Sequence, residues 1–136
     1  MKRRDFIACA GAAGLLPAAL QAAPIPYTPG LVRERLAAGE TVFLDFKATW
    51  CTTCKAQERV MTRLKEANPE YEANIAFVVV DWDTYGKSNF ATGLKIPRRS
   101  TLVVLKGNEE IGRLVAETRE DKIKELMDAA LSAATA

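Results

Sequence analysis

The sequence predicts an α/β protein, with a central mixed sheet of four to five strands and helices on both faces. Apolar, β-branched runs of strand length alternate with segments whose apolar residues recur at helical spacing. The last two strand candidates are separated only by a short turn, which is typical of a hairpin. A length of 136 residues suits one domain with a modest core.

The pattern along the chain sets the expected order of elements. These are an extended entry (24–30), a helix (31–38), a strand (41–46), a helix (53–67), a strand (75–80), a helical patch (88–92), two strands (102–105 and 111–115) and a last helix. A capping-box-like start, Thr118-x-x-Asp121, is expected to open that helix. Helical crossovers predict that the first three strands run parallel and that the last two pair antiparallel. The buried stripe of the 53–67 helix is expected at Ala56, Val60, Met61, Leu64 and Ala67.

Residues 1–23 have the pattern of an export signal, which leaves residues 24–136 as the folded domain. A charged start, Lys2-Arg3-Arg4, precedes a mostly apolar stretch from Ile7 to Leu20 that is too short to span a membrane comfortably. The run Arg3-Arg4-Asp5-Phe6-Ile7 resembles a bacterial twin-arginine signal. A plain secretory signal and an uncleaved membrane anchor remain open. Each of these alternatives predicts a periplasmic or exported protein.

Charge and composition exclude several function classes. The formal net charge is +2, and the cluster at the N-terminus accounts for the excess, so the remaining chain is nearly neutral. A neutral domain is not typical of nucleic-acid binding. The chain has no histidine, which removes the commonest general base and metal ligand. We therefore expect no nucleic-acid partner and a monomeric protein.

Two cysteines at Cys-x-x-Cys spacing carry the chemistry. Cys51 and Cys54 follow a strongly apolar strand and begin a helix of apolar periodicity. Thiols at this spacing can close a small reversible disulfide. The N–H groups and dipole of the helix start stabilise a thiolate, so the pKa of Cys51 should fall below the ordinary value. Cys54, one turn further along, is expected to be less accessible.

The run Asp45-Phe46-Lys47-Ala48-Thr49-Trp50-Cys51-Thr52-Thr53-Cys54-Lys55 resembles the thioredoxin family. That family typically shows Asp-Phe-x-Ala-x-Trp-Cys-x-x-Cys-Lys, and the element order agrees over nearly all of residues 27–132. The resemblance implies the thioredoxin fold and a protein-disulfide oxidoreductase. It implies no cofactor other than the redox-active Cys51–Cys54 disulfide. Its partners would be protein disulfides or dithiols, and in an oxidising compartment a membrane-bound electron donor.

The resemblance also implies individual roles. Cys51 would be the exposed nucleophile, and Cys54 the resolving thiol. Asp45 would be a buried acid of raised pKa that accepts the proton of Cys54; the alternative is an outward residue sharing a strand face with Lys47. Trp50 would flank the thiolate on the recognition surface, the alternative being a core aromatic.

Two positions near the cysteines depart from the family pattern, and a basic pair lies beside them. The family's cis-proline position falls on Ser100, if the Thr that follows marks it, or on Pro97 with a longer loop. Thr52-Thr53 stands between the cysteines and offers only hydroxyl hydrogen bonds, where strong periplasmic oxidases depend on a histidine. Arg98-Arg99 is either a solvated loop or a contact of Arg99 to an acidic substrate patch.

These features favour a reductant or isomerase of intermediate potential. The alternative from another class is a Cu(I)-binding or metallochaperone module that uses the same dithiol, because soft thiolates suit Cu(I). A third interpretation is a redox-inert interaction module. Structural zinc is disfavoured, because it needs four ligands and the chain offers no second cysteine pair or histidine.

Overall fold

A computed structural model of the protein describes residues 24–136, and the predicted export signal lies outside the described residues. Five strands form one mixed sheet in the order β2-β4-β3-β5-β6. The strands are β2 (Ile25–Pro26), β3 (Thr41–Lys47), β4 (Ile75–Asp81), β5 (Thr101–Lys106) and β6 (Glu109–Val115). The helices are α1 (Leu31–Ala37), α2 (Thr52–Ala67), α3 (Glu70–Asn74), α4 (Trp82–Tyr85), α5 (Asn89–Gly93) and α6 (Glu120–Thr135).

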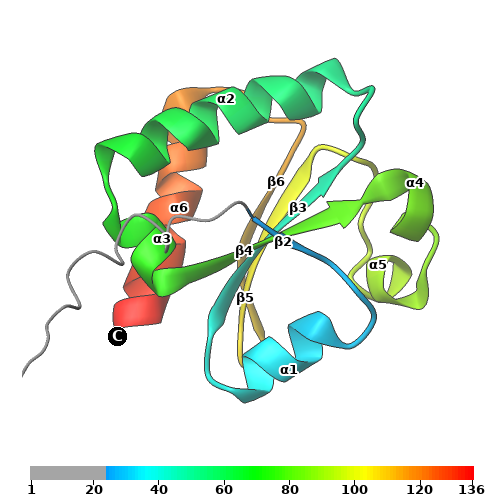
Figure 1. The fold of residues 1–136 in the computed structure, drawn as a ribbon, viewed down its shortest axis with the longest axis horizontal. Coiled ribbons are helices and arrows are strands. Elements are labelled where there is room, and N and C mark those ends of the chain that lie inside the picture. The colour runs from blue at the N-terminus through cyan, green and yellow to red at the C-terminus, as the bar shows by residue number, and fades with distance from the viewer. Residues whose placement is uncertain (1–23) are drawn as a thin grey trace, which may run out of the picture.

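Helices cover both faces of the sheet (Figure 1). Side chains alternate along β3, so Phe43 packs with α2, α3 and α6, while Val42, Leu44 and Phe46 pack toward α1 and α5. The α2/α6 face carries long helices of 16 residues each. The opposite face carries the short helices α1, α4 and α5, of seven, four and five residues. The predicted fold class is confirmed.

The direction of β5 corrects one prediction. β3 and β4 pair in parallel, but β5 pairs antiparallel to β3, with Phe46 opposite Thr101. The connection from β4 to β5 contains two helices of four and five residues, each only about 6–8 Å long. A strand of seven residues spans roughly 23 Å. The connection therefore re-enters the sheet at the end it left, beside the C-terminal end of β3.

Two helix predictions also need correction. The last helix begins after Arg119, which has no side-chain cap, and not with Thr118 as the cap. The Arg119 backbone N–H and guanidinium both donate hydrogen bonds to the Glu117 carboxylate, so Arg119 lies before the helix and not within it. On α2 the buried stripe includes Gln57, whereas Ala67 is exposed.

Among residues 24–136, no helix is both long and apolar enough to cross a bilayer.

Candidate active site

The two cysteines lie at the start of α2, directly beyond the end of β3. Cys51 is the residue that caps α2, and its sulfur accepts a hydrogen bond from the Cys54 backbone N–H at 3.2 Å. Both residues are thiols, not joined to each other. The helix start thus supplies a direct N–H donor and the positive end of the helix dipole to one sulfur, as the spacing predicts.

The Ser100 hydroxyl contacts both sulfurs. Its oxygen lies 3.2 Å from Cys51 Sγ and 3.1 Å from Cys54 Sγ. A hydroxyl carries one proton, so it donates to one sulfur at a time and can accept from the thiol of the other. Rotation about the C–O bond lets the same group stabilise a thiolate at either cysteine.

The backbone of Ser100 is held in an uncommon conformation. Its φ is 67°, in the left-handed region, where a residue with a Cβ costs roughly 1–2 kcal/mol. Its N–H donates to the Phe46 carbonyl at 2.7 Å, and its carbonyl accepts from the Ala116 N–H at 2.8 Å. These bonds hold the loop against the end of β3 and aim the side chain at the sulfurs.

Gln57 is a supporting residue that the sequence patterns did not identify. It is fully buried on α2, and its amide donates to the carbonyls of Ser100 and Glu117, each at 3.0 Å. The only sequence signal was a polar residue on the otherwise apolar stripe of α2. A buried amide needs partners, and here they are two loop carbonyls.

Pro97, the other candidate for the position facing the dithiol, is exposed, and no peptide bond within residues 24–136 is cis. The structure therefore places Ser100 against the sulfurs and Pro97 away from them.

The two thiols differ in acidity. Burial disfavours the Cys51 thiolate, but hydrogen bonds from the Cys54 thiol, Ser100, the Cys54 backbone and Arg99 outweigh that cost and lower its pKa to about 6. Burial, together with the hydrogen bond to Cys51, raises the pKa of Cys54. At neutral pH the site therefore holds one thiolate, at Cys51, and one thiol. Thr52 and Thr53 are not among the groups that lower the pKa of Cys51 in the described residues; Thr52 is exposed and Thr53 half-buried.

The expectation that Cys51 is exposed is wrong. Its exposed fraction is 2%, and that of Cys54 is 1%. Ser100 lies against both sulfurs, and the Arg99 guanidinium lies over the Trp50 ring, with Cζ 4.5 Å from the ring centroid. Arg99 is also among the groups that lower the pKa of Cys51, the sulfur that the family resemblance assigns to substrate attack.

Trp50 lies on the surface and not in the core. Its exposed fraction is 55%, and the indole N–H donates to the Asp83 carboxylate at 3.1 Å. Arg99 stacks on the ring. Contacts with one acid and one base thus fix the orientation of an exposed aromatic beside the thiolate.

Asp45 is buried in the centre of β3, with an exposed fraction of 6%. Burial raises its pKa from 3.8 to about 7, opposed by the charge of Lys47 and reinforced by Glu58. One carboxyl oxygen has no hydrogen-bond partner among the described residues. Asp45 and Lys47 share one strand face and line a cavity of about 300 Å³ beneath α2, which is roomy enough for water.

No group of three or more histidine, cysteine, aspartate or glutamate side chains suited to a metal ion occurs in the described part of the chain.

Residues 30–129 match the family model described as Thioredoxin. The chain belongs to the thioredoxin family. It is 35% identical to Thioredoxin H5 of Oryza sativa subsp. japonica over 83 residues, 61% of this chain and 57% of that protein. It is also 35% identical to a thioredoxin of Coprinus comatus over 78 residues, 57% of this chain and 69% of that protein. The matched region thus spans little more than half of the rice protein.

Solved structures agree with the fold. The crystal structure of Trxlp from Edwardsiella tarda EIB202 superposes with a TM-score of 0.67 at 27% identity, covering 77% of this chain and 98% of that chain. Mitochondrial thioredoxin 3 from Saccharomyces cerevisiae superposes with a TM-score of 0.63 at 23% identity and supports the fold alone. The predicted family is confirmed.

Removing the Ser100 hydroxyl should make Cys51 less acidic. We expect Ser100→Gly and Ser100→Ala both to raise the midpoint of the pH profile for iodoacetamide alkylation of Cys51 by about one pH unit, because a hydrogen bond to a thiolate is lost. Glycine relieves the left-handed backbone and alanine does not, so an effect common to both variants reports the hydroxyl. Ser132→Ala, at an exposed position of α6, is the control. An unchanged midpoint in both Ser100 variants would contradict the assignment.

Replacing Asp45 should stabilise the reduced protein in a pH-dependent way. Between pH 4 and 7 the unfolded chain ionises Asp45 while the fold keeps it neutral, so stability is lost as pH rises through the folded pKa of about 7. The full penalty is roughly 4 kcal/mol. Urea unfolding should show Asp45→Asn gaining a few kcal/mol over the parent at pH 8 and little at pH 4. Exposed Asp121→Asn is the control, and equal gains at both pH values would refute the argument.

Proposed function

We propose that the chain is a thiol–disulfide oxidoreductase that exchanges disulfides with protein substrates and works as a reductant or isomerase. The observation that supports this most directly is the pair of thiols at the start of α2, both within 3.2 Å of one hydroxyl, with the pKa of Cys51 lowered to about 6. A thiolate at neutral pH next to a protonated thiol is what nucleophilic attack followed by resolution requires.

The proposed reaction has two exchanges. The Cys51 thiolate attacks a substrate disulfide, forms a mixed disulfide and releases one substrate sulfur as a thiolate. Cys54 then loses its proton to the Asp45 carboxylate, attacks Cys51 and releases the second substrate sulfur. Two electrons pass to the substrate, and the Cys51–Cys54 disulfide forms. Ser100 donates its hydrogen bond first to the Cys51 thiolate and then, once Cys51 is bonded and uncharged, to Cys54.

The acidity of Cys51 supports an intermediate reduction potential. Strong disulfide oxidases have nucleophile pKa values near about 3.5, and reducing family members near about 7. A pKa of about 6 lies closer to the reducing end. No histidine stands between the cysteines to lower it further. Trp50, Thr52 and Thr53 form the rim that a docked substrate would contact.

We place this activity in the bacterial periplasm, or outside the cell, on the basis of the twin-arginine-like pattern at Arg3-Arg4. The signal is either cleaved or kept as an anchor. That compartment is oxidising, so a reductant there needs electrons from a membrane-bound donor. We propose that the chain acts as a monomer.

The decisive experiment measures turnover and potential together. We expect the reduced protein to accelerate insulin reduction by dithiothreitol, and its dithiol to equilibrate with glutathione at a potential between about −270 and −180 mV. Cys51→Ser should abolish turnover. Cys54→Ser should accumulate mixed disulfides with substrate proteins.

A potential near about −120 mV would instead indicate an oxidase. Tight stoichiometric Cu(I) retention without turnover would refute the redox assignment altogether.

A further inference from the structure

Arg99 directly precedes Ser100, whose hydroxyl contacts both sulfurs of the dithiol. Its guanidinium stacks on exposed Trp50, and Arg99 is one of the groups that lower the pKa of buried Cys51. The Nε atom of Arg99 is buried without a hydrogen-bond partner among residues 24–136. A buried donor without a hydrogen-bond partner costs free energy, so the Arg99 side chain would gain by pairing with an acceptor on a substrate.

The charges around Arg99 favour an anion. Exposed Lys55 lies in the first turn of α2, directly after Cys54, and Arg98 precedes Arg99 in the loop. The nearby acid, Asp83, accepts a hydrogen bond from the neutral Trp50 indole and so keeps its negative charge. In the described part of the chain, no salt bridge involves Arg98, Arg99 or Lys55. The three basic side chains outnumber that one acid and have no ion-pair partner.

The first exchange removes the anion that Arg99 faces. When Cys51 forms the mixed disulfide, its negative charge leaves with the departing substrate sulfur. Arg99 then has no anionic partner at Cys51, while its fork of N–H donors suits a carboxylate.

We propose that Arg99 is a gate over Cys51 that selects protein disulfides flanked by an acidic residue, whose carboxylate draws the guanidinium off the sulfur and pairs with it during attack. This specificity rests on the proposed disulfide exchange. Arg99 is a positioning and specificity residue here; Cys51 and Cys54 carry the electrons.

The test compares reduction of three cyclic peptides, each closed by a Cys-Gly-Gly-Cys disulfide and flanked by Glu, Gln or Lys. Single-turnover rates with the reduced full chain at pH 8, where the Cys51 thiolate predominates, should fall in the order Glu, Gln, Lys. The Glu peptide should react about threefold to tenfold faster than the Gln peptide at low salt. Added salt should shrink that preference.

In Arg99→Gln, the Glu and Gln peptides should be reduced at equal rates. Alkylation of Cys51 by a bulky maleimide should also become faster relative to alkylation by iodoacetamide, because the guanidinium is gone. Arg59→Gln, on the exposed side of α2, should keep the wild-type preference. A preference that survives in Arg99→Gln, or none in the wild type, overturns the gate. If the wild type reduces none of the peptides or insulin, the oxidoreductase assignment itself fails.

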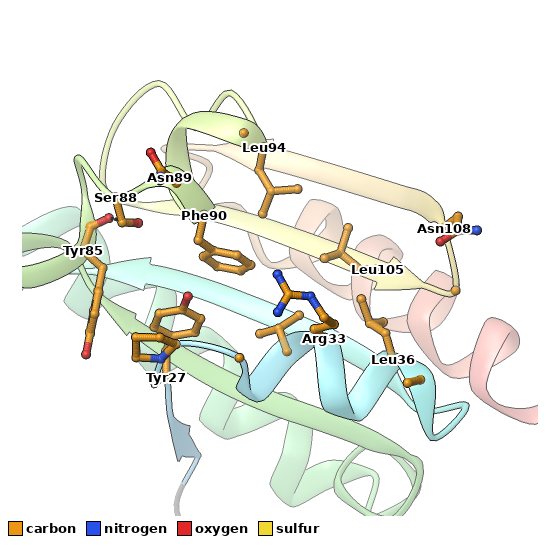
Figure 2. Close-up of a pocket in the computed structure, with 16 residues that line it drawn as sticks. Tyr27, Arg33, Leu36, Tyr85, Ser88, Asn89, Phe90, Leu94, Leu105 and Asn108 are labelled. Atoms are coloured by element: carbon orange, nitrogen blue, oxygen red, sulfur yellow. Dashed lines mark hydrogen bonds between the residues drawn. The ribbon is translucent and has the colours of Figure 1, made fainter.

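An independent feature lies on the opposite face of the sheet. A pocket of about 830 Å³ lies between α1, α5 and the β5–β6 turn (Figure 2). Short helices cover this face, and α4 contributes Tyr85 to the pocket lining. The volume is within the range of small-molecule sites.

The walls of this pocket are ordered and apolar. Tyr27 stacks on Phe90 at 4.6 Å and meets Tyr85 edge-on at 4.8 Å between ring centroids. Leu36, Leu94 and Leu105 line the remainder. Among the described residues, Arg33 is the one charged side chain in the lining, and Figure 2 shows its guanidinium extending across the mouth toward Phe90.

The structure assigns this pocket to a small amphipathic carboxylate, with its apolar body against the aromatic wall and its anionic head at Arg33. No acidic side chain within residues 24–136 lines the pocket to compete for that arginine. This site does not depend on the dithiol.

Calorimetry with the full chain and three probes tests the assignment. Phenylbutyrate should bind about tenfold tighter than phenylbutylamine, with phenylbutanol between them, because only the head-group charge differs. Arg33→Glu should reverse the order. A Cβ on Gly93 meets no atom within 4 Å, so Gly93→Phe should fill the pocket and abolish binding, while Gly93→Ala should not. Equal affinity for all three probes, no binding, or binding that survives Gly93→Phe overturns the assignment.

Discussion

The site depends on the hydrogen bond from the Ser100 N–H to the Phe46 carbonyl. This 2.7 Å hydrogen bond joins the loop before β5 to Phe46, near the C-terminal end of β3 and shortly before Cys51 in the chain. Without it, neither the hydroxyl of Ser100 nor the guanidinium of Arg99 would face a sulfur. The left-handed φ of Ser100 is tolerated because the Ala116 N–H and the Gln57 amide hold the same residue from its carbonyl side. Backbone geometry therefore sets the chemistry of the dithiol.

Much of this arrangement could be predicted from the sequence, because local patterns determine it. The β-branched run of β3 and the periodicity of α2 fix a strand end beside a helix start, and that alone brings Cys51 to helix N–H groups. These are properties of neighbouring residues, and such properties are visible in a linear sequence.

What could not be predicted depends on contacts between distant segments. The antiparallel direction of β5 depends on how far α4 and α5 carry the chain, which apolar periodicity does not reveal. Pro69 follows the end of α2 and is also the residue that caps the start of α3. The arrangement beside Cys51 includes a loop residue, Arg99, that stacks on Trp50 from another element. The role of Gln57 depends on the positions of two carbonyls in distant loops, which the sequence of α2 does not reveal.

The charges of the site are coupled in a way that orders the proposed reaction. The Cys51 thiolate is one of the groups that raise the pKa of Asp45, whose largest cause is burial. In the reduced protein this repulsion favours the neutral acid. Once Cys51 is joined to a substrate, its charge is gone, and the pKa of Asp45 falls. The carboxylate form then becomes more populated at the step in which Cys54 must give up a proton. Arg99 loses its thiolate partner at that same step. The bond to the substrate thus removes the negative charge at Cys51 and readies the base, so resolution is favoured only after capture.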